Sequence, residues 1–222
     1  MKLRPPASTE STESNSSTPQ PLRRLLVAGS LLLAARAVWR PAIAQGKLRP
    51  TPSQTEGPFY PTTLPDDTDN DLLRQGQRSY AHGLPVWLEG TLSDVDGRAL
   101  AGGTVEIWQC DHAGHYHHPG DGGKADLDFQ GFGRAEVDRD GRFRFRTIRP
   151  VAYVGRTPHI HVKVKLGTRE LLTTQLYVAG EPGNERDGLW RRLNAAERAA
   201  LTLPYSAGAQ GLQARCSLVV QT

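Results

Sequence analysis

Two tyrosines and two histidines in the middle of the chain carry side chains that together could bind a metal ion. They are Tyr116, Tyr153, His159 and His161. In an extended segment, residues i and i+2 point to the same face, so His159 and His161 can present ring nitrogens to one ion. Imidazole alone suits zinc, copper, nickel or iron, whereas an anionic phenolate is a hard ligand that stabilises a trivalent ion. If the four side chains converge, the donor set predicts ferric iron, Fe(3+).

Each pair alone is a weak signal, because His-x-His pairs occur by chance in strands and single tyrosines often lie at strand ends. The order of the four residues along the chain strengthens the prediction. Tyr116 follows the turn after one expected strand, and Tyr153 precedes the expected strand that begins with His159. All four residues can therefore meet at one end of a β-sandwich, where loops carry function.

The segments that position these residues are short and strand-like. Alternating apolar and polar residues between Gly and Asp turns predict seven strands, at residues 85–92, 103–110, 133–137, 142–148, 159–165, 171–178 and 214–220. The turn at 138–141 predicts that the strands on either side of it form a hairpin. The expected fold is all-β, an antiparallel β-sandwich with little helix. The one expected helical segment is 184–201, in which Asn194 and Glu197 match a capping box.

Residues 1–46 differ in composition from residues 47–222, which we expect to form a single domain. Residues 1–20 are rich in Ser, Thr, Pro and Glu, a composition typical of disordered segments. The net charge of +4 comes from scattered basic residues, without a Lys/Arg stripe interleaved with aromatic residues. Nucleic acid is therefore not an expected partner.

The leader also resembles an export signal. The pair Arg23-Arg24, an apolar run at 25–35 and the small residues at 42–44 follow the order of the basic, apolar and cleavage regions of such a signal. The paired arginines favour the twin-arginine route and hence a periplasmic or extracellular protein. If residues 21–45 are instead a disordered tail with an apolar patch, the protein is cytoplasmic. The apolar run is too short for stable membrane insertion.

Two cysteines, Cys110 and Cys216, lie in strand-like segments. In an exported protein, a disulfide between them would close a loop of about a hundred residues and stabilise the fold by a few kcal/mol. Two buried free thiols are an equally good interpretation. The metal prediction depends on neither cysteine.

Longer stretches around the four candidate ligands resemble the intradiol ring-cleavage dioxygenases. The resemblance is to the β-subunit type of protocatechuate 3,4-dioxygenase and to the related catechol and hydroxyquinol 1,2-dioxygenases. The matching segments follow the family's order and are residues 51–61, 105–111, 113–116, 133–150, 153–161 and 174–177. Together they extend from about residue 51 to 180, most of the predicted domain.

The resemblance implies a role for each matched residue. Tyr116, Tyr153, His159 and His161 match the four iron ligands, and Tyr153 is also expected to act in catalysis by leaving the metal and taking up a substrate proton. The other implied site residues are Arg156, which is expected to stabilise negative charge on the activated ring, Gln175, which is expected to line the substrate cavity, and Tyr60, whose loop is expected to touch substrate.

The implied reaction inserts both atoms of O2 into a catecholic ring and gives a muconic-acid-type product, as in aromatic catabolism. A catechol and O2 are the expected small-molecule partners, and a homodimer or a hetero-oligomer is the expected assembly. Only five residues separate Tyr153 from His159, and Gly155 lies where the family often has an aromatic residue. This departure predicts a more open pocket and argues against protocatechuate as the substrate.

Two other classes of protein share parts of these patterns. Non-catalytic modules of the transthyretin-like or carboxypeptidase-regulatory-like kind share the pattern Asp-x-x-Gly-x-Phe-x-Phe, found here at 138–145. A zinc or copper site could instead use His159 and His161 with histidines from 115–118. Such modules have no need for two tyrosines and a His-x-His together with Arg156 and Gln175, which favours the ferric enzyme.

Overall fold

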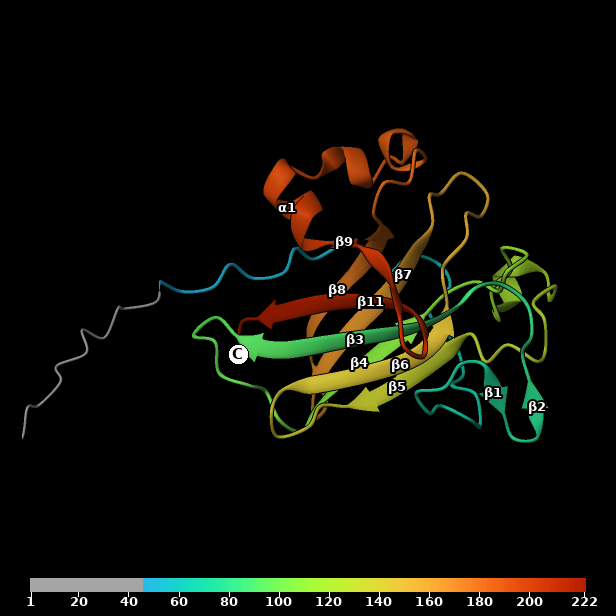
Figure 1. Cartoon of the computed structure of the whole chain (residues 1–222), viewed down its shortest axis with the longest axis horizontal. Helices are drawn as coiled ribbons and strands as arrows, with labels where there is room; N and C mark the ends of the chain where they lie inside the picture. The colour runs from blue at the N-terminus through green and yellow to red at the C-terminus, as the bar shows by residue number, and fades with distance from the viewer. Residues whose placement is uncertain (1–45) are drawn as a thin grey trace, which may run out of the picture. The chain divides into compact units, whose positions relative to one another are not determined.

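Strands and turns form most of residues 46–222, the part of the chain that the computed structural model describes (Figure 1). The predicted leader, with its export signal, lies outside these residues except for its final position, Gly46. The described residues 46–222 belong to one compact unit. Within the described part, no helix is long and apolar enough to cross a membrane.

Two sheets form the body of this unit (Figure 1). The four-stranded sheet has the order β10 (Tyr205–Gly208), β11 (Gly211–Val220), β3 (Pro85–Asp94) and β6 (Arg142–Ile148). The five-stranded sheet has the order β5 (Phe132–Glu136), β4 (Gly103–Trp108), β7 (His159–Leu166), β8 (Arg169–Val178) and β9 (Thr202–Leu203). A separate ribbon joins β1 (Arg74–Gln75) to β2 (Arg78–Ser79). The all-β prediction is confirmed, and the seven predicted strands match β3 to β8 and β11 within three residues at each end.

Two details of the predicted topology are wrong. The sheets are mixed and not wholly antiparallel, because β11 pairs with β3, and β9 with β8, in parallel. A long connection between two strands, unlike a tight turn, leaves their relative direction free. The strands around the turn at 138–141 form no hairpin, since β5 pairs with β4 in one sheet and β6 with β3 in the other. The turn therefore carries the chain from one sheet to the other.

Apolar side chains from the inward faces of both sheets form the core. They include Val86, Leu88, Leu92, Val105, Ile107, Phe143, Phe145, Ile160, Val162 and Val164. Gly90 lies directly opposite Phe143 in the β3–β6 register. A Cβ added at Gly90 would lie only 2.1 Å from Phe143 Cζ, so glycine is what lets this ring lie across the strand. Trp108 has the opposite phase and joins a second, smaller aromatic cluster with Tyr116 and Phe132.

The predicted helix at 184–201 is interrupted. It consists of two single 3₁₀ turns, η2 (Asn184–Arg186) and η3 (Trp190–Arg192), followed by the short helix α1 (Ala195–Ala200). The predicted capping box is confirmed, because Asn194 Oδ1 accepts from Glu197 N at 3.0 Å and Glu197 Oε2 accepts from Asn194 N at 2.8 Å. Asp187 interrupts the pattern because its carboxylate accepts hydrogen bonds from nearby backbone N–H groups.

Both cysteines are free thiols in this fold. Cys110 is buried in the smaller aromatic cluster, and Cys216 packs at the edge of the main core. Burial raises the pKa of each thiol to about 12. The structure therefore corresponds to the free-thiol interpretation.

Candidate metal centre and active site

His159 and His161 lie side by side on the outward face of β7, where both are buried. Their Nε2 atoms are 3.1 Å apart. The Nδ1 of His159 lies 2.7 Å from the carbonyl oxygen of Thr157, which can only accept, so Nδ1 carries the proton and Nε2 is left with its lone pair. Burial lowers the pKa of His159 to about 4 and that of His161 well below its ordinary value. Both rings are therefore neutral near pH 7 and able to act as donors.

The two tyrosines meet these histidines. The ring of Tyr116 lies 5.1 Å from that of Tyr153 and 5.9 Å from that of His161, and the ring of Tyr153 lies 5.5 Å from that of His159, all between centroids. The hydroxyl of Tyr116 is buried and has no hydrogen-bond partner among the described residues. Burial raises the pKa of Tyr116 well above its ordinary value and that of Tyr153 less strongly. The fold thus brings together all four predicted donors.

A buried aspartate holds the loop that carries Tyr116. Asp111 Oδ1 accepts from the backbone N of Ala113 and of His115, both at 2.9 Å, directly before the tyrosine. Gly114 has φ +86°, and a Cβ there would lie 3.2 Å from the carbonyl oxygen of Ala152. Glycine at this position therefore lets the loop of Tyr116 approach the loop of Tyr153.

Two of the three histidines around Tyr116 have local polar partners. His115 Nδ1 lies 3.3 Å from Asp121 Oδ2, and His118 Nδ1 accepts from Gly120 N at 3.0 Å at the start of η1 (Pro119–Asp121). Within residues 46–222, no three His, Cys, Asp or Glu side chains form a group that could hold a metal ion. The zinc or copper alternative therefore finds no third donor of these types, and the donors beside His159 and His161 are phenols.

Arg156 lies beside the donors and is held on two sides. Its Nε donates to Asp187 Oδ2 at 2.7 Å, and its Nη2 donates to Gln175 Oε1 at 2.6 Å. Gln175 lies opposite His161 in the β7–β8 register, which brings the predicted arginine and glutamine together next to the donors. Sequence reasoning missed Asp187, because it lies inside the segment that was expected to be one helix.

Residues 51–60, here called the strap, run from β11 in the four-stranded sheet past β8 in the five-stranded sheet to the site. The strap is tied to β11 by Thr51, whose N donates to the Val219 carbonyl at 2.8 Å and whose hydroxyl accepts from Val219 N at 2.9 Å. It is tied to β8 by Thr55, whose carbonyl oxygen accepts from Gln175 Nε2 at 3.0 Å. Further along, a Cβ at Gly57 would lie 3.4 Å from His161 Cε1, so the strap passes directly over that ring.

The aromatic residue of the strap that contacts the donors is Phe59. Its ring stacks on Tyr116 with centroids 4.6 Å apart and meets the edge of Tyr153 at 5.9 Å. The predicted residue, Tyr60, instead packs edge-on against Trp108 at 5.0 Å. Trp108 in turn stacks on His161 at 4.7 Å, with ring planes 9° apart. Tyr60 is therefore separated from His161 by an indole ring, and sequence reasoning missed Phe59 because nothing in the sequence shows which of two adjacent aromatic residues faces the site.

A buried carboxylate holds Tyr60. The side chain of Glu106 is 0% exposed and accepts from Tyr60 Oη at 2.8 Å, from Arg134 Nη2 at 2.8 Å and from Lys165 Nζ at 3.0 Å. Burial by itself would raise the pKa of Glu106, but these hydrogen bonds lower it below its ordinary value. The network anchors the strap from behind Trp108.

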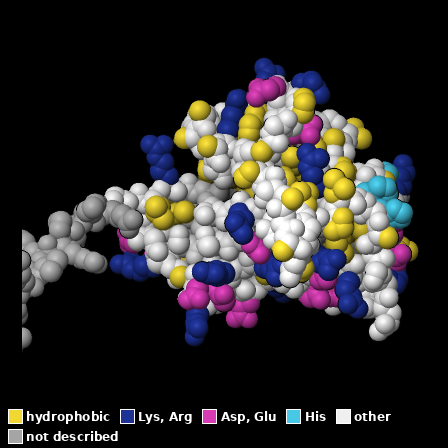
Figure 2. Space-filling view, viewed as in Figure 1, with side chains coloured by type: hydrophobic (Ala, Val, Ile, Leu, Met, Phe, Trp, Pro, Cys, Tyr) yellow, Lys and Arg dark blue, Asp and Glu magenta, His cyan; other side chains and the backbone are white. Residues whose placement is uncertain are grey.

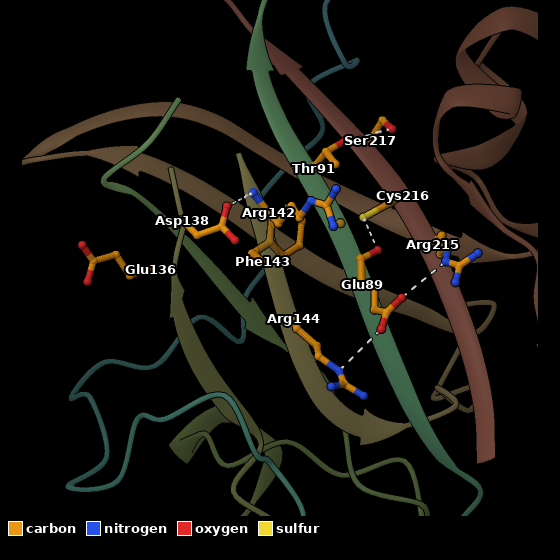
Figure 3. Close-up of a pocket in the computed structure, with 11 residues that line it drawn as sticks. Glu89, Thr91, Glu136, Asp138, Arg142, Phe143, Arg144, Arg215, Cys216 and Ser217 are labelled. Carbon is orange, nitrogen blue, oxygen red and sulfur yellow. Dashed lines mark hydrogen bonds and ion pairs between the residues drawn. The ribbon is translucent and has the colours of Figure 1, made fainter. Parts of the chain in front are cut away.

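A surface hollow lies on the four-stranded sheet, away from these donors. Its volume is about 730 Å³, and its lining residues come mainly from β3, β6 and β11 (Figure 3). Glu89 is its central charge and lies 3.6 Å from Arg144 Nε and 3.3 Å from Arg215 Nε. None of the predicted site residues lines it.

Comparison with known proteins shows which proteins this chain is similar to. A model of the dioxygenase family matches residues 55–215, well over half of the chain. The protocatechuate 3,4-dioxygenase beta chain of Burkholderia cepacia is 30% identical over 187 residues, which cover 76% of this chain and 79% of that protein. Catechol 1,2-dioxygenase of Acinetobacter baylyi is 31% identical, over 60% of this chain and 47% of that protein. The protein is thus similar to dioxygenases over most of its described length.

A solved structure gives the same result. The dioxygenase domain of a dioxygenase–carbohydrate-binding protein fusion from Streptomyces sp. SirexAA-E has a TM-score of 0.63 and 31% identity, and the match covers 78% of this chain and 99% of that one. This chain spans about half the length of the hydroxyquinol and catechol 1,2-dioxygenases that it matches. Within the dioxygenases, the chain belongs to the intradiol ring-cleavage family.

Proposed function

We propose that this protein is an Fe(3+)-dependent enzyme that opens the ring of a catechol between its two hydroxyl-bearing carbons, using both atoms of O2, to give a muconic-acid-type product. The observation that carries the proposal is the meeting of two neutral imidazoles with two phenols, one buried and one partly buried. The names of the relatives, which are dioxygenases of catechol, hydroxyquinol and protocatechuate, support the substrate class.

The donor set fits ferric iron. A buried tyrosine hydroxyl without a partner is costly unless something binds it, and the hydroxyl of Tyr116 is such a group. As a phenolate it would need a cation beside it, and phenolate oxygens prefer a hard trivalent ion. Tyr116, Tyr153, His159 and His161 would hold the metal. When bound, ferric iron would act as a Lewis acid that makes a chelated catechol reactive toward O2.

The residues of the chain would supply the remaining steps. Tyr153 is less buried than Tyr116, and the charge of Arg156 opposes the rise that burial causes in its pKa, so its oxygen is suited to take up a proton from a substrate hydroxyl. Arg156 is fixed by two hydrogen bonds, and its remaining N–H groups would donate to a substrate oxygen on which negative charge develops. Phe59 and Trp108 cover the donors with apolar surface and exclude water from them.

The colour of the purified protein tests this proposal. Charge transfer from tyrosinate to Fe(III) absorbs visible light, so iron-loaded protein should be red to burgundy, change colour when catechol is added under nitrogen, and consume O2 once air is admitted. Tyr116→Phe should lose most of the colour and of the O2 uptake. Tyr205→Phe is the matched control, because Tyr205 on β10 also has a buried hydroxyl without a partner among the described residues. A colourless wild-type protein that retains stoichiometric zinc would contradict the proposal.

The non-catalytic module is not favoured. The pattern at 138–145 that it shares with this chain is accounted for by the turn between the sheets and the start of β6. The pattern therefore reports on the sandwich fold and does not distinguish a module from an enzyme.

A further inference from the structure

We propose that this site selects catechols that carry an apolar or no substituent and discriminates against carboxylated catechols such as protocatechuate. The inference rests on the proposed function and narrows its substrate. Its grounds are the charge balance around Arg156 and the apolar side chains that surround the donors.

The charge of Arg156 is already matched by a buried carboxylate. Asp187 is 0% exposed, and its Oδ2 accepts from Arg156 Nε at 2.7 Å and from Thr157 N at 3.1 Å. Its Oδ1 accepts from Leu189 N at 2.9 Å and from Trp190 N at 3.1 Å, so the carboxylate cannot turn away. Burial alone would raise the pKa of Asp187, but the hydrogen bond from Arg156 keeps it below its ordinary value, and Asp187 is anionic.

A matched pair of this kind does not compensate an anionic substituent. A carboxylate that enters the site loses its hydration and meets a guanidinium whose charge is balanced, with the Asp187 charge close behind it. The N–H groups of Arg156 still donate to oxygens of the catechol, because donation does not require net charge. Arg156 can therefore bind the oxygens of the ring but offers no net charge to attract an acidic substituent.

Three other cations of the five-stranded sheet are paired with carboxylates as well. Lys163 forms ion pairs with Glu56 and Glu170, and its ammonium lies 3.9 Å from the centre of the Tyr60 ring. Lys165 and Arg134 both bind Glu106. Each of these cations has a carboxylate partner that an incoming substrate carboxylate would have to displace.

Exposed apolar side chains lie next to Tyr153 in the chain and beside Tyr116. Val154, in the turn between Tyr153 and Arg156, is 97% exposed, and Leu127 is 69% exposed. Leu127, Pro119 and Ala125 line a cavity of about 280 Å³ beside Tyr116, together with the imidazoles of His117 and His118. Figure 2 shows histidine and hydrophobic side chains close together at one end of the molecule. Exposed apolar surface at such a place gains free energy by contact with an apolar substituent.

Wild-type enzyme provides the first test. With iron-loaded protein at pH 7.5, we expect kcat/KM from O2 uptake to be at least about tenfold higher for 4-methylcatechol than for protocatechuate. Equal values, or a preference for protocatechuate, would overturn the inference while leaving the proposed function intact. If iron-loaded protein consumes no O2 with any catechol, the proposed function itself fails.

Asp187→Asn provides the second test, because it removes the compensating charge and keeps a side-chain oxygen for the backbone N–H groups. We expect it to reduce the ratio of kcat/KM for 4-methylcatechol to kcat/KM for protocatechuate by about tenfold, mainly through a lower KM for protocatechuate. Glu181→Gln is the matched control, since it removes the same charge from the same loop but its ion-pair partner is Arg149, and it should leave the ratio unchanged. Equal losses with both substrates in Asp187→Asn would show that Asp187 only positions Arg156.

Two further variants address a failure of Asp187→Asn to fold and an unexpected preference for protocatechuate. Val154→Lys adds a cation at an exposed position where folding is not at risk, so it can replace Asp187→Asn if that variant fails to fold. We expect it to narrow the same ratio of kcat/KM values. Lys124 is exposed on the loop that carries Leu127 but does not line the cavity beside Tyr116. A preference for protocatechuate that disappears in Lys124→Ala would contradict the inference, because it would show that Lys124 binds the substrate carboxylate.

Discussion

At the scale of single residues, the site depends on the groups that orient Arg156 and His159 as much as on the four donors. Arg156 is oriented by Asp187 and Gln175, and His159 by the carbonyl oxygen of Thr157. These partners fix which atoms face the substrate before any ligand binds. Such preorganisation is what lets charge stabilisation act without reorganisation during a reaction.

Loss of the buried charge of Glu106 should weaken the fold. In Glu106→Gln, Arg134 and Lys165 lose their buried counter-charge, and we expect the free energy of unfolding at pH 7 to fall by about 2 kcal/mol. This is below the value for a fully buried pair because both cations are partly exposed. Urea unfolding measures the change, and Glu89→Gln, which removes a more exposed carboxylate, should cost less than about 1 kcal/mol.

The pH dependence of the same variant has a defined sign. The folded-state pKa of Glu106 lies below its ordinary value, so its contribution to stability is complete above about pH 4.5 and is lost as the pH falls through the lowered pKa. The difference in unfolding free energy between wild type and Glu106→Gln should therefore shrink below about pH 4. A difference that stays constant down to pH 3 would show that the carboxylate charge is not what stabilises the network.

At the scale of elements, the close contact between Gly90 on β3 and Phe143 on β6 is the clearest steric constraint. Gly90→Ala should lower the free energy of unfolding by about 1–3 kcal/mol, because the ring of Phe143 must move away from the added methyl group. In the double variant with Phe143→Leu, part of that cost should disappear, since the smaller side chain leaves room. Strict additivity in a urea-unfolding cycle would contradict this explanation.

Strand positions followed from the sequence because alternation records which face of each strand is buried. Connectivity followed less well. The Asp/Gly turn at 138–141 has the same local chemistry whether the chain folds back in one sheet or crosses to the other, and only the pairing of β5 with β4 decides it. The donors were predictable because their spacing is local or at strand ends. Asp187 was not, since its role arises only when the loop after β8 folds back onto Arg156.

At the scale of the whole molecule, metal binding and folding should be coupled. The donors come from the loop after β4, from the loop before β7 and from β7 itself, so an ion bound to all of them would bind the folded state and not the unfolded chain. Removing iron with a chelator should lower the unfolding temperature, and the stabilisation should be about 4 kcal/mol when free iron exceeds its dissociation constant a thousandfold. Calorimetry on the loaded and the chelated protein measures this, and Tyr116→Phe should respond much less to the chelator.

The strap has a consequence for the order of events during synthesis. Its first residue, Thr51, emerges early from the ribosome, but the hydrogen bonds that fix Thr51 go to Val219 on β11, which is made more than a hundred residues later. The first residue of the strap therefore stays unanchored on the nascent chain until β11 has been translated, whereas Thr55 can already be held by Gln175 on β8 and Tyr60 by Glu106 on β4. The part of the strap that passes over His161 can thus be fixed first, and Thr51 is the last part of the cover to be secured.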